Sequence, residues 1–183
     1  MRKYLITSLA LLAFCSQLEA TEVDILTSQG TIRVDLKDEA APKTVENFLR
    51  YADEGFYDET IFHRVIRGFM VQGGGFTTDL ERKTTHQAVA YEGDNGLANN
   101  RGTLAMARTQ DPNSATSQFF VNQVDNAFLN DGSRGAAGYT VFGEVVTGMD
   151  IVDAISAVPT SSVGPYQNVP TTPVVIKSIV RVN

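Results

Sequence analysis

The chain has 183 residues, of which 15 are Lys or Arg and 21 are Asp or Glu, so its formal net charge is −6. Nucleic acid and anionic membrane surfaces repel an acidic domain of this kind, and we expect neither as a partner of the processed chain. The single cysteine, Cys15, lies in an N-terminal leader that we expect to be removed, which leaves no thiol nucleophile and no disulfide in the processed chain.

The first twenty residues have the layout of a secretory signal peptide. Arg2 and Lys3 supply a positive start, residues 5–14 (LITSLALLAF) are mostly apolar, and the sequence LEA precedes a cleavage site after Ala20. A membrane anchor is one alternative, but an apolar stretch this short is about half of what a bilayer requires. Lipidation of Cys15 is another, which is disfavoured because a large phenylalanine precedes it. We therefore expect export and a mature domain of residues 21–183.

The mature chain opens with the pattern of a β-hairpin followed by a helix. Apolar and polar residues alternate near 23–26 and again over 31–36, with Ser-Gln-Gly between them at 28–30. Pro42 then suits the first turn of a helix, the following apolar residues recur at helical spacing, and Gly55 suits its end.

From Thr60 onward the pattern is typical of strands joined by long polar loops. We predict strands over 103–107, 118–124, 139–146 and 173–182, loops over 77–100 and 130–138, and a second helix over 148–158. Many strands, two helices and no regular alternation of strand and helix favour a single mainly β domain, a closed antiparallel barrel capped by helices.

The usual catalytic constellations are missing from the mature sequence. With only two histidines, His63 and His86, and no cysteine, a zinc site of the usual composition is not expected. The glycines at 73–75 are not followed by the residues of a phosphate-binding loop, so we interpret them as points where backbones approach or bend. No Gly-x-Ser-x-Gly motif marks a nucleophilic serine.

One stretch, FHRVIRGFMVQGGGF at 62–76, places Arg64 within an apolar run, where a cation is costly unless it is paired or employed. This stretch resembles the signature of cyclophilins, which are barrel-shaped peptidyl-prolyl cis–trans isomerases. The resemblance continues in GTLAMAR (102–108), SQFF (117–120), AFL (127–129) and YTVFGEVVTGMDIVD (139–153), over nearly the whole mature chain. With the leader and the ending VGPYQNVPTTPVVI, the chain is most similar to the bacterial periplasmic branch.

The resemblance implies an eight-stranded antiparallel β-barrel capped by two α-helices, and an isomerase that uses neither metal nor cofactor. It makes Arg64 the catalytic residue, on a barrel strand that faces a surface groove. An arginine suits this task because it stays charged and offers a rigid set of donors that can favour the twisted X-Pro bond over its planar forms. The residues that match the family's substrate site are Phe69, Met70, Gln72, Ala107, Arg108, Gln118, Phe120, Phe128, Leu129 and Tyr139.

These matching residues have different expected roles. Gln72 would orient the arginine, backbone groups near 107 and 108 would hold the peptide extended, and Gln118 would form part of the groove wall. The proline ring would be bound by an apolar set, which spacing alone would assign to the core: Phe69, Met70, Phe120 and Leu129.

Four positions depart from the family pattern. Phe128 stands where the best-known cyclosporin-sensitive members have tryptophan, and the loss of the indole N–H and of ring area predicts weak cyclosporin binding. Tyr139 replaces a histidine on the groove rim, which we expect to shift substrate preference and to spare catalysis. Arg67 replaces a proline and adds a second cation near the site. Arg108 replaces an asparagine at a position whose contact is largely through the backbone, so we expect tolerance there.

The expected partners are proline-containing peptides and unfolded exported proteins in the periplasm, and we expect a monomer. Two alternatives stay open. A binding module on the same scaffold would hold proline peptides with little turnover. A carrier would hold a small molecule inside the barrel, which requires a hollow interior, whereas the supply of large apolar residues favours a filled one.

Overall fold

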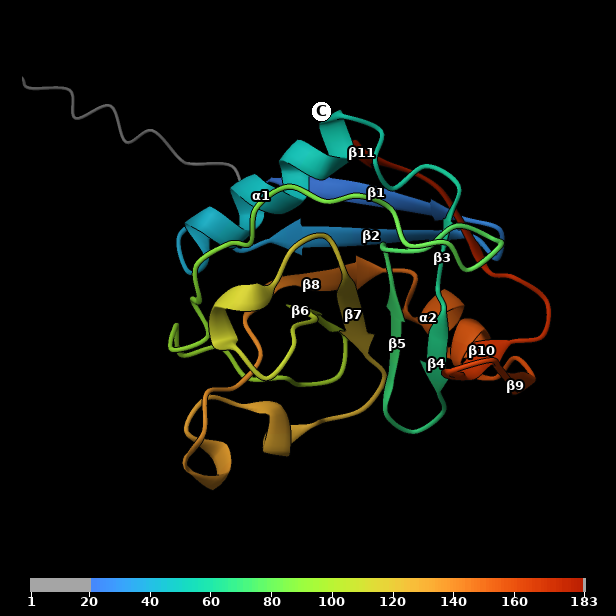
Figure 1. Ribbon diagram of the computed structural model, residues 1–183. Helices are drawn as coiled ribbons and strands as arrows, with labels where there is room; N and C mark the ends of the chain where they lie inside the picture. Colours follow the sequence, from blue (N-terminus) through green and yellow to red (C-terminus); the bar gives the residue numbers. More distant parts are fainter. Residues whose placement is uncertain (1–20, 183) are drawn as a thin grey trace, which may run out of the picture.

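The computed structural model describes residues 21–182, and the predicted signal peptide, residues 1–20, lies outside this part. The chain forms a curled antiparallel sheet with two helices (Figure 1). The sheet strands are β1 (Glu22–Thr27), β2 (Thr31–Leu36), β3 (Thr60–Ile61), β4 (Arg64–Ile66), β5 (Met70–Gly73), β6 (Thr103–Met106), β7 (Phe119–Asn122), β8 (Val141–Thr147) and β11 (Val175–Arg181). The helices are α1 (Pro42–Asp53) and α2 (Met149–Ser156), and β9 (Thr160–Val163) pairs with β10 (Tyr166–Pro170) in a separate hairpin.

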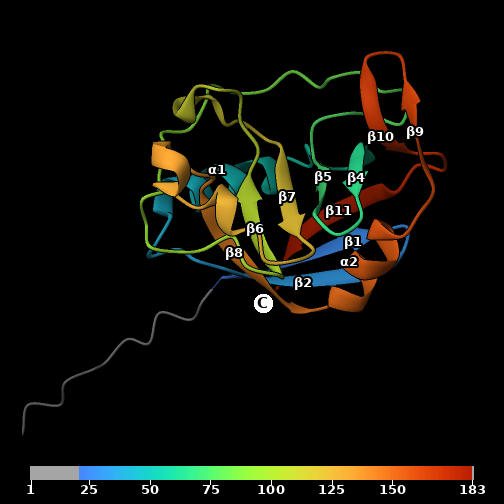
Figure 2. The same ribbon diagram turned by 90° about the horizontal axis from the view of Figure 1, so that it is seen from below.

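The sheet is curled, and the strands at its two edges, β3 and β4, follow each other directly along the chain. Its strand order is β3-β11-β1-β2-β8-β6-β7-β5-β4, and only residues 62 and 63 separate the edge strands β3 and β4. Counted as one interrupted strand, β3 and β4 give the eight strands that were predicted. The view from below shows the strands following one another around the sheet (Figure 2). Of the predicted closed antiparallel barrel capped by two helices, the mainly β composition, the antiparallel sheet, which is curled, and the two helices are confirmed.

Helix α1 is fixed to the sheet by aromatic packing. The Phe48 ring lies 5.3 Å from Tyr57, 5.5 Å from Phe119 and 5.1 Å from Phe142, measured between ring centroids, and all four side chains are fully buried. Such edge and tilted contacts suit the charge distribution of aromatic rings. With these large side chains filling the interior, the structure argues against a carrier with a hollow barrel.

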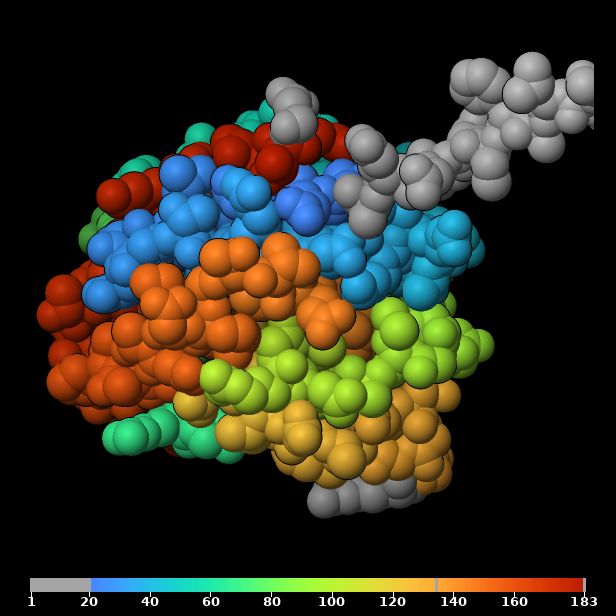
Figure 3. All heavy atoms as spheres, turned by 180° about the vertical axis from the view of Figure 1, so that it is seen from behind, coloured from blue at the N-terminus to red at the C-terminus, as the bar shows by residue number. Residues whose placement is uncertain are grey.

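Helix α2 packs into the same core as α1 through Val152 and Ile155, which are fully buried, and lies beside the first hairpin. Gly30, in the β1–β2 turn, has a φ of +142°, which favours glycine, and a Cβ there would lie 2.7 Å from the end of the Ile151 side chain and displace it. Seen from behind, the N-terminal strands (blue) lie next to the segment that contains β8 and α2 (orange), in agreement with the pairing of β2 and β8 (Figure 3). Over residues 21–182 no helix has the length and apolarity needed to cross a membrane.

Several predicted elements are present but shorter than predicted. The strand expected over 118–124 is β7, the helix expected over 148–158 is α2, and the strand expected over 139–146 is β8, which begins at Val141. Strand β8 starts late because the Tyr139 N–H donates to the Leu129 carbonyl (2.9 Å) instead of to a neighbouring strand. The closing strand begins at Val175, after Pro173, which has no N–H to donate. The hairpin formed by β9 and β10 was not predicted.

Candidate active site

The pairing of β4 with β5 places the Arg64 side chain beside Gln72 and Met70. In the antiparallel pair of β4 and β5, Arg64 lies opposite Gln72 and Ile66 opposite Met70. Residues directly opposite each other share a face of the sheet, so the arginine and the glutamine point to the same side. Arg64 Nη1 lies 3.4 Å from Gln72 Oε1 and 4.0 Å from Met70 Sδ.

The hydrogen-bond chain continues from Gln72 to Gln118, the residue just before β7. Gln72 Nε2 donates to Gln118 Oε1 (3.0 Å), so Gln118 fixes the orientation of the amide that faces Arg64. A Cβ at Gly75 would lie 2.4 Å from Gln118 Cγ, which explains why glycine is needed there. The expected orienting role of Gln72 therefore has a geometric basis in this chain of two amides.

A small pocket opens beside Arg64 with a volume of about 170 Å³. Met70 and Phe120 form its buried floor and pack on Ala105 and Val141 in an apolar cluster that is separate from the main core. The pocket brings together nine of the eleven residues predicted for the site: Arg64, Phe69, Met70, Gln72, Ala107, Arg108, Phe120, Leu129 and Tyr139.

The two remaining predicted residues lie next to this pocket but do not line it. Phe128 is 48% exposed and stacks on the Phe69 ring, with centroids 5.6 Å apart and planes inclined by 27°. It therefore forms an outer rim of the site. Gln118 lines a neighbouring depression on the other side of Arg64.

The sequence predicted only backbone contacts for Arg108, but its side chain also helps to build the site. Its Nε donates to the Gly138 carbonyl (3.0 Å) and its Nη1 to the Thr109 carbonyl (2.8 Å), and the guanidinium lies 4.7 Å from the centroid of the Tyr139 ring. The Tyr139 ring in turn meets Phe120 edge-on, with centroids 5.6 Å apart. Arg108 thus ties two loops together and positions one wall of the pocket.

A buried asparagine network, which the sequence prediction missed, holds the backbone of the pocket from behind. Asn122 Nδ2 donates to Asn99 Oδ1 (3.1 Å), and Asn126 Nδ2 donates to Asn122 Oδ1 (2.7 Å). These three asparagines are at most 2% exposed. The network also donates to carbonyl groups of three pocket residues, Phe69, Leu129 and Tyr139. Asn122, within the apolar pattern of β7, was the signal that could have revealed it, because buried amides need partners.

Arg64 supplies the positive charge at this site, and the neighbouring His63 is uncharged at neutral pH. Burial, with a further contribution from the positive charge of Arg64, lowers the pKa of His63 to about 4. The His63 imidazole is therefore neutral at neutral pH. Among residues 21–182, no group of three or more His, Cys, Asp or Glu side chains is placed to share a metal ion.

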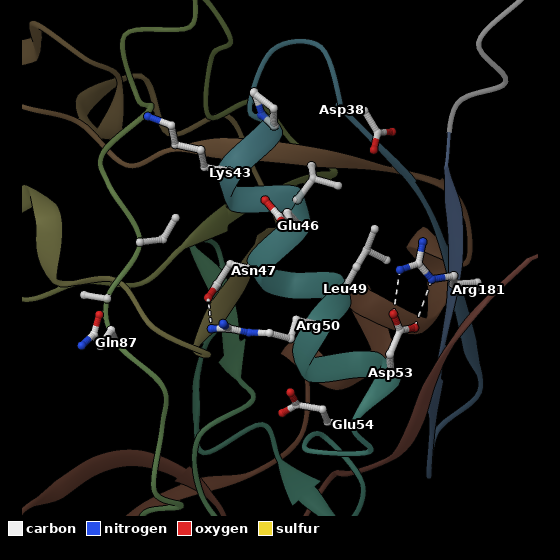
Figure 4. Close-up of a pocket in the computed structure, with 14 residues that line it drawn as sticks. Asp38, Lys43, Glu46, Asn47, Leu49, Arg50, Asp53, Glu54, Gln87 and Arg181 are labelled. Carbon is white, nitrogen blue, oxygen red and sulfur yellow. Dashed lines mark hydrogen bonds and ion pairs between the residues drawn. The ribbon is translucent and has the colours of Figure 1, made fainter.

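A larger depression, of about 950 Å³, lies along the exposed side of α1 and contains none of the predicted site residues. Charged side chains surround it, and Asp53 at the end of the helix forms two hydrogen bonds with Arg181 of β11, of 3.0 and 2.7 Å (Figure 4). This ion pair anchors the last strand to the helix. Size alone would thus point to a different place from the candidate site beside Arg64.

Comparisons with known proteins show the family to which the chain belongs. Residues 22–181 match the family described as cyclophilin type peptidyl-prolyl cis-trans isomerase/CLD. The chain is 55% identical over 176 residues to peptidyl-prolyl cis-trans isomerase A of Dickeya dadantii, covering 94% of this chain and 92% of the relative. It is 54% identical over 155 residues to peptidyl-prolyl cis-trans isomerase B of Escherichia coli, covering 84% and 94%.

A solved structure with the same fold is a cyclophilin type peptidyl-prolyl cis-trans isomerase of Cryptosporidium parvum. It has a TM-score of 0.73 and 27% sequence identity, and the match covers 90% of this chain and 99% of the other. A second structure of that enzyme, obtained in the presence of the dipeptide Ala-Pro, has a TM-score of 0.71 and 28% identity, covering 88% and 99%. The chain described here therefore belongs to the cyclophilin family and is a peptidyl-prolyl cis–trans isomerase.

Proposed function

We propose that Arg64 accelerates rotation about X-Pro bonds by stabilising the twisted amide while the adjacent pocket holds the proline ring. One observation carries this proposal: a guanidinium lies at an apolar pocket, oriented by Gln72, and forms no ion pair with any carboxylate of residues 21–182. Its donors are therefore not neutralised by the protein before a substrate arrives.

The chemistry follows from the electronic structure of the amide. Delocalisation of the nitrogen lone pair into the carbonyl gives a rotation barrier of about 18–20 kcal/mol. In the twisted state the lone pair is localised on the prolyl nitrogen and can accept a hydrogen bond from Arg64. Only an interaction that is stronger in the transition state than in the ground state accelerates a step, and this one satisfies that condition.

The arginine supplies only part of the acceleration. A hydrogen bond to a charged group contributes about 1.5–3 kcal/mol, which corresponds to roughly a ten- to hundredfold rate increase. Donors fixed in a site with little water contribute more, because they need no reorganisation during the reaction. The apolar floor of Met70 and Phe120 would provide such a site by removing water from the amide as the proline ring binds.

The test is NMR exchange between the cis and trans forms of a short Ala-Pro peptide. We expect Arg64→Ala to lower the exchange rate at least tenfold while the protein stays folded. Arg67→Ala is the matched control, because Arg67 is an exposed arginine three residues away that does not line the pocket, and it should keep nearly full activity. Equal losses in both variants would contradict the assigned role of Arg64. Peptide binding without any acceleration by the native protein would instead favour the binding-module alternative.

The proposal extends to where the enzyme acts. The leader of residues 1–20 supports cleavage after Ala20, export to the periplasm and a role in folding exported proteins, for which uncatalysed X-Pro isomerisation, taking tens to hundreds of seconds, is slow enough to limit the rate. Cell fractionation followed by mass measurement of the periplasmic form tests this. A chain that keeps its leader in the cytoplasm would overturn it.

A further inference from the structure

A second depression opens on the other side of Arg64, between β4 and the hairpin formed by β9 and β10. Its volume is about 420 Å³, and Arg64 is the residue that it shares with the proline pocket. The residues that line it are His63, Arg64, Phe76, Gln118, Pro165, Tyr166, Gln167 and Asn168. A peptide with its proline ring in the smaller pocket would therefore have a second cavity within reach of its neighbouring residues.

Aromatic rings form one wall of this depression. The His63 ring lies 4.5 Å from Phe76, and the Phe76 ring meets Tyr166 at 5.2 Å with an interplanar angle of 70°. His63 and Phe76 are each 6% exposed, whereas Tyr166 is partly exposed. The backbone of this wall is fixed, because the Ile61 N–H donates to the Phe76 carbonyl (3.0 Å). His63, Phe76 and Tyr166 therefore form a continuous aromatic surface, and of the three rings only that of Tyr166 is partly exposed to solvent.

The hairpin contains a β-bulge where it borders the depression. Tyr166 pairs with Val163 and Val169 pairs with Ser161, so the two residues between them, Gln167 and Asn168, oppose a single residue of β9. Asn168 has a φ of +58°, a left-handed conformation that is uncommon for a residue other than glycine. Bulges and strained backbone are enriched beside functional sites, where they redirect side chains. Both bulged residues line the cavity.

The depression offers hydrogen-bond donors and contains no carboxylate among its lining residues. Arg64 carries its one full charge, since the pKa of His63 is lowered to about 4 by burial and by Arg64. Gln118 accepts from Gln72 through Oε1, which leaves its Nε2 as a donor. A cationic side chain would meet the positive charge of Arg64 with no carboxylate to offset it, whereas a neutral planar ring would meet the aromatic wall without this repulsion.

We propose that this depression is a specificity subsite that binds an aromatic side chain flanking the X-Pro pair of the substrate and disfavours lysine or arginine there. The inference rests on the proposed function of the pocket beside Arg64. Aromatic rings prefer edge-to-face and offset contacts with one another, and the inclined rings of Phe76 and Tyr166 provide such surfaces.

The experiment compares peptides by NMR exchange. The reference is acetyl-Ala-Ala-Ala-Pro-Ala-Ala-amide, and phenylalanine or lysine replaces alanine either just before or just after the Ala-Pro pair. For the native protein we expect kcat/KM to be about 3- to 10-fold higher with phenylalanine than with alanine at one of these positions, mainly through KM. Lysine at the same position should lower kcat/KM.

The deciding variant is Tyr166→Ala, and Val163→Ala is its matched control on the same hairpin, because Val163 is exposed and does not line the cavity. Tyr166→Ala should abolish the preference for phenylalanine and leave the all-alanine peptide unchanged, and Val163→Ala should keep the preference. A preference that survives Tyr166→Ala, or equal losses on all peptides, overturns the subsite. Intermolecular NOEs from the peptide ring to Phe76 and Tyr166 of the native protein provide a second test that does not depend on a variant, and their absence also overturns it.

These outcomes separate the two proposals. If the native protein accelerates all peptides equally, the subsite fails and the isomerase mechanism stands. If Arg64→Ala is as active as the native protein, the proposed mechanism fails whatever the peptide preference.

Discussion

At the scale of single residues, His63 links the active-site strand to the pH dependence of stability. Burial and neighbouring Arg64 lower its pKa to about 4 in the folded chain, against an ordinary value of 6.5. Between pH 6.5 and pH 4 the unfolded chain therefore binds a proton that the folded chain does not, and the free energy of unfolding falls as the pH falls. We expect a loss of about 3 kcal/mol across this window, at 1.36 kcal/mol per pKa unit.

Urea unfolding at a series of pH values measures this loss. His63→Phe keeps an aromatic ring against Phe76 and should flatten the profile between pH 6.5 and pH 4. The carboxyls of Asp24 and Asp153, whose pKa values are lowered mainly by hydrogen bonds from Arg33 and Arg101, begin to lose their stabilisation only near pH 4 and below. An unaltered slope in His63→Phe would show that other groups cause the effect.

At the scale of elements, the start of α1 depends on a residue from a distant loop. Ala41 at the N-cap offers no side-chain hydrogen bond. Instead, Glu92 accepts from the backbone N–H groups of Thr44 (2.8 Å) and Lys43 (3.1 Å), and from the Thr44 hydroxyl (2.7 Å). A carboxylate at this end also interacts favourably with the helix dipole.

Glu92→Ala should lower the free energy of unfolding by about 1–2 kcal/mol, the typical cost of losing a helix cap. The matched control is Glu46→Ala, because Glu46 is exposed on the same helix and its loss should change stability by less than about 0.5 kcal/mol. Denaturant unfolding of both variants decides the point. Similar small losses in both would mean that water replaces Glu92 without cost.

The same scale shows which parts of the structure the sequence could predict. The first hairpin and α1 follow from alternation, Pro42 and Gly55, because these signals are local and the folded backbone obeys them. The strand ends were less predictable, since Tyr139 gives its N–H to Leu129, a partner set by tertiary structure. The pocket residues were assigned by family resemblance, whereas spacing alone placed them in the core. Both readings hold for Met70 and Phe120, which are buried and also line the pocket.

Contacts between distant side chains were beyond the reach of the sequence. The side chain of Arg108 binds loop carbonyls that local patterns do not bring together, and the asparagine network joins residues from three segments. The hairpin of β9 and β10 was missed because its strands are exposed or irregular and carry no clear alternation. Arg108, the asparagine network and the hairpin of β9 and β10 all shape the walls of the two depressions beside Arg64. The substrate specificity of the site is therefore harder to predict from the sequence than the fold.

At the scale of the whole molecule, the proposed removal of the leader would create a new charge at a defined place. Cleavage after Ala20 turns the backbone nitrogen of Thr21 into an α-ammonium group. In the structure this nitrogen lies 3.3 Å from Asp38 Oδ2, next to the segment that leads into α1. The processed chain would therefore gain an ion pair between its first residue and the β2–α1 connection that the unprocessed chain replaces with a neutral hydrogen bond.

We expect this ion pair to stabilise the processed chain by about 0.5 kcal/mol, the usual value for a partly exposed pair, and less at high salt. The measurement is a double-mutant cycle by urea unfolding, in which the chain beginning at Thr21 and a chain with Gly-Ser added before Thr21 are each compared with and without Asp38→Asn. The extension should destabilise the protein only when Asp38 is present. If the extension has the same effect in both backgrounds, the new terminus gains nothing from Asp38, and processing would then serve export without adding stability to the domain.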